Sequence, residues 1–168
     1  MKNRIKIILF CISIIAFVGC DRTTKNIAKD HLKNKGTISW FHDTFRLEYA
    51  ENTGAAMNLG DGLSKIASYW LLSIVPLLFL LIMFGYTLKN FGRMSNEKLI
   101  CYSLIIAGGL GNIIDRLQFE RHVTDFMNFG IRDFRTGIFN FADLYITMGV
   151  VWILFSFMGK KQKSTTAI

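Results

Sequence analysis

IASYWLLSIVPLLFLLIMFGYTL, residues 66–88, contains no charged side chain. A bilayer core of about 30 Å is crossed by roughly 20 residues of helix. This stretch is long enough and apolar enough to cross it. A soluble domain rarely keeps its apolar residues in such long uncharged blocks. The stretch therefore predicts a transmembrane helix.

Three further apolar runs lie on either side of this one. Residues 7–20 and 99–114 are uncharged, and residues 137–159 contain Asp143 as their one charged residue. The run at 99–114 is slightly short and needs one more turn of helix. We predict an all-α polytopic membrane protein whose 168 residues form a single domain with four transmembrane helices. The predicted helices cover about residues 5–34, 66–88, 97–117 and 138–159.

The charge pattern predicts the orientation of these helices. The net charge is +8, and residues 1–6, 89–98 and 160–168 hold nine Lys and Arg residues against Glu97 alone. Short loops rich in Lys and Arg lie on the cytoplasmic side of membrane proteins. We therefore expect both termini in the cytoplasm. The basic pI of about 9.6 then reflects orientation and contact with anionic lipid headgroups, and no nucleic-acid partner is expected.

The first apolar run has a second possible interpretation. KIILFCISIIAFVGCDRTTK, residues 6–25, has the basic start, apolar run and cysteine of a bacterial lipoprotein signal peptide. A secreted lipoprotein would continue as a soluble domain, whereas here three more apolar runs follow. We therefore expect a retained helix. Cys11, Cys20 and Cys101 form neither a disulfide framework nor a zinc site by their spacing, and we interpret them as small packing residues.

The segment after the first helix predicts a small β structure. We expect the helix to end at Gly36, because glycine commonly follows the last helical turn. Apolar residues then alternate along 38–40 and 45–49 around a polar turn, which indicates a hairpin within an outer β segment of about residues 37–60. An isolated hairpin is only marginally stable. Its apolar face should therefore rest on the helix ends or the bilayer interface.

Polar residues gather where the third helix is expected to leave the membrane. Asn112 and Asp115 are three residues apart and share one helix face. The helix C-terminus disfavours an anion at Asp115, so this carboxylate needs a cation, for which Arg116, Lys25 and Arg22 are the candidates. A purely structural ion pair at the helix end is an equally good interpretation.

A similar pair stands at the start of the last helix. Asn140 and Asp143 are three residues apart, which suits a helix N-cap and an acid in the first turn. The neighbours of Asp143 are apolar, however, and a carboxylate at membrane depth is costly enough to suggest a function. Both interpretations stay open on spacing alone.

Asp125 lies in the short segment between these two helices. That segment could fold back and bring Asp125 over Asp143, where two close carboxylates would share one proton and activate a water. A solvated loop acid is the plainer alternative. The histidines His31, His42 and His122 are scattered, which argues against a serine triad or a zinc site.

Five motifs in order carry a resemblance to a known family. They are DRTTK at 21–25, ENTGAA at 51–56, GGLGNIIDR at 108–116, VTDF at 123–126 and FNFADLYI at 139–146. Together they resemble the lipoprotein signal peptidases, the signal peptidase II family of bacterial aspartyl proteases. The resemblance covers roughly residues 5–158.

The resemblance implies a fold, a reaction and a location. The fold is four helices with an outer β-cradle that lies on the membrane. The substrate is a prolipoprotein that already carries diacylglycerol, and the cut falls just before the lipid-bearing cysteine. The enzyme lies in the bacterial inner membrane with its active site near the outer face, contacts membrane lipid, uses no metal or cofactor, and is expected to be a monomer.

The resemblance also implies roles for individual residues. Asp125 and Asp143 match the catalytic pair of the family. From its place at a helix N-terminus, Asp143 is expected to ionise more easily, which leaves the shared proton on Asp125. The positions that match supporting or substrate-contacting residues are Asn52, Gly54, Asn112, Asp115, Arg116, Asn140, Asp21 and Lys25. Of these, Asp21 and Lys25 are expected at the substrate-facing rim.

Two other function classes remain as alternatives. A small membrane carrier could use Asp143 and Asp115 to move protons or cations, or could bind lipid, although the chain lacks the internal repeat common in transporters. A non-catalytic assembly protein would leave the polar clusters unexplained.

Overall fold

The computed structural model describes residues 2–54, 60 and 62–165, without the side chains of residues 2 and 157–165. The helical elements are α1 (Lys2–Leu32), α2 (Lys65–Tyr69), the π-helical turn η2 (Trp70–Ile74), α3 (Val75–Asn90), the 3₁₀ turn η3 (Phe91–Arg93), α4 (Asn96–Gln118) and α5 (Phe141–Thr165). The strands are β1 (Ile38–Trp40), β2 (Phe45–Asn52), β3 (Val123–Ile131) and β4 (Phe134–Arg135).

Several of these helices have the length and apolar character of membrane spans. Among the described residues, three qualify over Asn3–Leu32, Lys65–Arg93 and Asn96–Gln118, and α5 is apolar over Phe141–Ser156. The structure is therefore helix-rich with several apolar helices, as predicted.

The end of α1 differs from the prediction. The helix stops at Leu32 rather than near Gly36, and Asn34 adopts the left-handed conformation with φ of 64°. Asparagine tolerates this conformation better than most residues, so it ends the helix before glycine is reached. The packing interpretation of the cysteines holds for Cys101, which is buried, and for Cys11, which packs against an apolar cluster; Cys20 is exposed on the surface of α1.

The helix predicted from the opening stretch is continuous but irregular. α2, η2 and α3 follow one another without a break, and the π-helical turn lies just before Pro76, the one proline of the chain. Proline has no backbone N–H and its ring crowds the carbonyl four residues earlier. A wider turn relieves that crowding.

The four strands form one sheet in the order β1-β2-β3-β4. The predicted hairpin is confirmed, since Ile38 lies opposite Leu47 and Trp40 opposite Phe45. The expectation that Asp125 lies in a loop is wrong, because β3 pairs with β2 along most of its length. The remainder of the predicted β segment includes residues 55–59, which lie outside the described residues.

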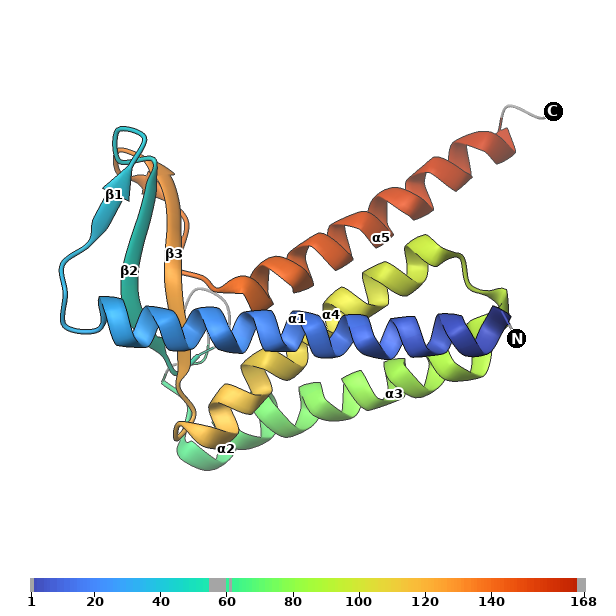
Figure 1. Cartoon of the computed structure of the whole chain (residues 1–168), viewed down its shortest axis with the longest axis horizontal. Helices are drawn as coiled ribbons and strands as arrows, with labels where there is room; N and C mark the ends of the chain where they lie inside the picture. Colours follow the sequence, from blue (N-terminus) through green and yellow to red (C-terminus); the bar gives the residue numbers. More distant parts are fainter. Residues whose placement is uncertain (1, 55–59, 61, 166–168) are drawn as a thin grey trace.

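The sheet lies at one end of the helices (Figure 1). α1 runs the length of the molecule, with its first turn at the end far from the sheet, and α5 leaves the sheet end and diverges toward that same far end. The strands run across the direction of α1 rather than along it. The sheet therefore covers the end of the bundle at which α5 begins.

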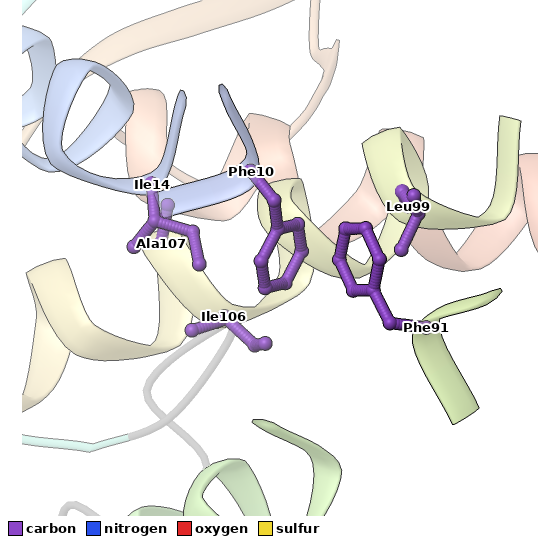
Figure 2. Packing of buried hydrophobic residues seen from close by; sticks show 6 residues of the cluster. All are labelled: Phe10, Ile14, Phe91, Leu99, Ile106 and Ala107. Atoms are coloured by element: carbon purple, nitrogen blue, oxygen red, sulfur yellow. The ribbon is translucent and has the colours of Figure 1, made fainter. Parts of the chain in front are cut away.

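An apolar cluster holds the far end of the bundle together. Phe10 and Ile14 of α1 pack with Ile106 of α4 and with Phe91 in the connection between α3 and α4. Figure 2 shows the rings of Phe10 and Phe91 next to each other, and their centroids are 5.9 Å apart in an edge-to-face arrangement. This packing brings three helices together away from the sheet.

α4 approaches both α1 and α5 closely through glycines. A Cβ atom on Gly108 would lie 2.3 Å from the carbonyl oxygen of Ala142, and one on Gly111 would lie 2.6 Å from Asp21 Oδ2. Small residues allow helix backbones to approach closely. These two glycines let the first turn of α5 and a carboxylate of α1 rest directly on α4.

Candidate active site

Asp143 lies in the first turn of α5 and caps its own helix. Its backbone N–H donates to Asn140 Oδ1 at 3.0 Å, and its Oδ2 accepts from the backbone N–H of Asn140 at 3.1 Å. This reciprocal pair is the capping-box arrangement. The N-cap interpretation of Asn140 is therefore confirmed, and it places the carboxylate of Asp143 at a defined point where the helix begins.

Asp125 reaches the same point from β3. Asn140 Nδ2 donates to Asp125 Oδ1 at 2.6 Å, and Asn52 Nδ2 on β2 donates to Asp125 Oδ2 at 3.1 Å. Asp125 is only 3% exposed and Asn140 is fully buried. Asn140 therefore contacts both carboxylates, one through its side-chain amide and the other through the helix cap.

The surroundings of Asp125 favour its protonated form. Burial and then the nearby charge of Asp143 raise the pKa of Asp125 from its ordinary 3.8 to about 7. The hydrogen bonds from Asn52 and Asn140 oppose this change, because they stabilise the ionised form, but they do not outweigh it. At neutral pH the side chain of Asp125 is thus poised to hold or release a proton.

Asn112 of α4 connects this pair to α1. Its Nδ2 donates to Asp143 Oδ1 at 2.8 Å. Its Oδ1 accepts from Asn140 Nδ2 at 3.2 Å and from Lys25 Nζ at 3.1 Å. Both oxygens of Asp143 therefore accept a hydrogen bond, one from Asn112 and one from the helix cap.

A cluster of charged side chains lies behind Asn112. Lys25 Nζ is 2.8 Å from both Asp21 Oδ2 and Asp115 Oδ2, and Arg22 also pairs with Asp115. Asp21 and Asp115 are fully buried, and Lys25 is 2% exposed. Of the candidate cations for Asp115, the structure places Lys25 and Arg22 on its carboxylate.

The position of this cluster corrects one expectation. Asp21 and Lys25 were expected at the substrate-facing rim, but they do not line the cavity, because this side of α1 is buried against α4 and α5. Asp21 Oδ1 accepts from the backbone N–H of Ala142 at 2.9 Å, which attaches α1 to the start of α5.

Arg116 extends the site toward the segment that follows β2. Its Nη2 donates to the carbonyl of Gly54 at 2.7 Å, and its Nη1 contacts the carbonyl of Asn112 at 3.4 Å. The backbone N–H of Gly54 donates to Asn52 Oδ1 at 2.8 Å. These contacts hold Asn52, which also contacts Asp125, against the C-terminal end of α4.

A cavity of about 640 Å³ opens beside the two carboxylates. Asp125, Asp143, Asn112, Arg116 and Asn52 contribute its polar wall. Its other walls are mostly apolar and come from η2 and α3, α4, the segment before α5, and α5 itself. Such a mixed cavity suits an extended ligand with long apolar parts and one polar reacting group.

All ten site residues proposed from the sequence fall in one connected network, but only some face the cavity. Asp21, Lys25, Asp115, Asn140 and Gly54 do not line it, and they contact the residues that do. Sequence reasoning missed the apolar wall, including Leu72, Pro76 and residues 136–139. The lone proline within an apolar run was the one signal for it.

The arrangement has the components of water activation by two carboxylates. One acid carries a raised pKa and the other accepts two hydrogen bonds that stabilise its anion. Within the described ranges, no group of three or more His, Cys, Asp or Glu side chains is placed to hold a metal ion.

Comparisons with known proteins agree over almost the whole chain. The family model described as signal peptidase (SPase) II matches residues 13–159. A lipoprotein signal peptidase of Borrelia duttonii (strain Ly) is 33% identical, with 98% of this chain and 96% of the relative covered. One from Fusobacterium nucleatum subsp. nucleatum is 37% identical, over 90% of this chain and 85% of the relative.

A solved bacterial membrane enzyme has a similar fold. It superposes with a TM-score of 0.75 over 92% of this chain and 90% of its own, at 24% sequence identity. This likeness supports the arrangement of the helices and sheet, and at this identity it concerns the fold alone.

Proposed function

The chain belongs to the signal peptidase II family, and we propose that it is an intramembrane aspartic endopeptidase that removes the signal peptide from prolipoproteins. The proposed substrate carries diacylglycerol on its lipobox cysteine, and the proposed cut falls just before that cysteine. The proposal rests chiefly on one observation: Asp125 and Asp143 line one cavity and are held together by Asn140.

The proposed mechanism divides the work between the two acids. Asp143, in its ionised form, removes a proton from a water held between the carboxylates, and the resulting hydroxide attacks the scissile carbonyl carbon. Asp125, in its protonated form, donates its proton to the carbonyl oxygen. The tetrahedral intermediate then loses the C–N bond as Asp143 gives its proton to the departing amine, while Asp125 recovers a proton as the carbonyl re-forms.

Neighbouring donors support this division of roles. The two hydrogen bonds that Asp143 accepts stabilise its carboxylate, and the raised pKa of Asp125 keeps a proton available near neutral pH. Arg116 lines the cavity with a positive charge close to both acids, where it can hold a carbonyl of the bound chain.

The same proposal places the protein in the bacterial inner membrane. α1, the α2–α3 helix, α4 and α5 would span the bilayer with both termini in the cytoplasm, since the basic segments at 2–6 and 89–98 lie at the end opposite the sheet. The active site would then lie near the outer face, beneath the sheet. A monomer surrounded by lipid is sufficient for this arrangement, because both acids come from one chain.

Separate substitution of the two acids tests the proposal. Asp125→Asn and Asp143→Asn keep the shape of the side chain but remove its ability to transfer protons. We expect each change to lower the rate of cleavage of a diacylglyceryl-modified prolipoprotein in detergent by roughly 10³-fold or more. Asp133→Asn makes the same chemical change at an exposed position and serves as the control. Near-normal cleavage by either active-site variant would refute the assignment.

The carrier alternative has less support from the geometry. It would use Asp143 and Asp115, yet Asp115 is fully buried, pairs with Lys25 and Arg22, and does not line the cavity. Failure of the unmodified protein to cleave any diacylglyceryl-prolipoprotein would return attention to that alternative.

A further inference from the structure

Lys25 is buried beside the active site but does not face the cavity. Its ammonium group contacts three oxygen atoms: it forms ion pairs with Asp21 Oδ2 and Asp115 Oδ2 at 2.8 Å, and it donates a hydrogen bond to Asn112 Oδ1 at 3.1 Å. Two of these acceptors neutralise charge. The third is a neutral amide, which needs no counter-ion and therefore calls for a different explanation.

The contact with Asn112 has a directional consequence. An asparagine amide has an accepting end and a donating end, whereas an ammonium group can only donate. Lys25 therefore requires the oxygen of Asn112 to face α1. Asn140 Nδ2 reaches the same oxygen at 3.2 Å, but its shorter hydrogen bond, at 2.6 Å, goes to Asp125 Oδ1. The donating end then faces Asp143 Oδ1, at 2.8 Å.

We propose that Lys25 is a positioning residue for the catalytic pair: its ammonium group fixes the amide orientation of Asn112, so that Asn112 donates to Asp143 and stabilises the carboxylate that acts as the base. This inference rests on the proposed function. Asp143 also faces the charges of Asp125 from β3 and of Arg116 from α4. Asp125 already places carboxyl oxygens close to Asp143. If the amide of Asn112 were reversed, its oxygen would be a second repulsive neighbour of the base.

The buried cluster provides a way to separate this role from charge balance. Asp21 and Asp115 carry two negative charges, and Lys25 and Arg22 carry two positive charges. The double variant Asp21→Asn/Lys25→Met removes one charge of each sign, so the Arg22–Asp115 pair remains balanced. If Lys25 only balances Asp21, the double variant should cleave almost as well as the unmodified protein.

On our proposal the double variant stays defective. We expect its kcat for a diacylglyceryl-prolipoprotein to fall roughly 10- to 100-fold, which corresponds to the loss of one hydrogen bond to a charged group. KM should change less than threefold, because Lys25 does not line the cavity.

A second comparison applies if the double variant fails to fold in detergent. Lys25→Arg retains a cation that can only donate, whereas Lys25→Gln introduces an amide that can pair with either end of Asn112. We expect the arginine variant to retain a kcat several-fold higher than that of the glutamine variant at matched thermal midpoints. Lys33→Met, which removes an exposed lysine–carboxylate pair with Glu51 just beyond α1, is the control for general loss of a lysine and should cleave normally.

The outcomes are distinguishable from failure of the proposed function. If the unmodified protein does not cleave, the proposed function is wrong, and this inference is overturned with it. If the unmodified protein cleaves, Asp143→Asn is inactive, and the double variant has a normal kcat, then only the role of Lys25 is refuted. Equal losses in the arginine and glutamine variants would refute it as well.

Discussion

Replacing Asp125 with asparagine should remove a pH dependence from the stability of the protein. Burial and the charge of Asp143 raise the pKa of Asp125 from 3.8 to about 7, so the folded protein binds this proton more tightly than the unfolded chain does. The resulting stabilisation is fully present below about pH 4 and is lost as the pH rises through about 7.

The size of the effect follows from the two pKa values. The difference between pKa values of 3.8 and about 7 corresponds to a contribution of Asp125 to the free energy of unfolding on the order of 4 kcal/mol. For a chain of 168 residues this corresponds to a change in Tm on the order of 10 °C. The side chain is only 3% exposed, so solvent screening does little to reduce this value.

Thermal unfolding in detergent at a series of pH values measures the effect. The unmodified protein should lose thermal stability steadily between about pH 4 and pH 7, whereas Asp125→Asn should lose much less over the same range. Asp143→Asn should retain part of the decline, because burial, which remains, is the larger cause of the raised pKa. If Asp125→Asn declines as steeply as the unmodified protein, another group is responsible and the argument about Asp125 is wrong.

Three further predictions concern the surroundings of the site. Asn52→Ala should raise the pKa of Asp125 further, because a hydrogen bond to its ionised form is lost, and the decline in Tm should extend to higher pH. Gly108→Ala should destabilise the protein by about 3 kcal/mol and reduce cleavage, because its Cβ would lie 2.3 Å from the carbonyl of Ala142 beside Asp143. Thermal unfolding and cleavage assays on the same preparation test both effects. Gly149→Ala, whose Cβ would lie 2.8 Å from the carbonyl oxygen of Cys101 near the start of α4, should lower Tm by a similar amount but leave kcat of the surviving folded protein unchanged.

The sequence predicted the helical framework well, because charged side chains are costly in the apolar core of a bilayer and helices that cross it are therefore long uncharged runs. It also predicted the hairpin and the N-cap at Asn140, since both depend on residues close together in the chain. These features need no knowledge of how distant segments meet.

The features that the sequence did not predict depend on contacts between distant segments. β3 is buried at six consecutive positions, Val123–Asn128, so its side chains lack the alternation that identifies a half-exposed strand. The apolar run of α1 likewise gives no indication of which side faces α4, and for that reason Asp21 and Lys25 were expected at the substrate-facing rim. Only the packing of α1 against α4 and α5 determines their burial.

The capping box at the start of α5 has a consequence for adaptation to different bilayers. Because Asp143 closes the first turn of its own helix, its position is fixed at that end, whatever the length of the remainder. Turns added or removed at the opposite end of α5 would change the hydrophobic length of the helix without displacing the carboxylate. A site built at a helix start can thus keep its geometry in membranes of different thickness.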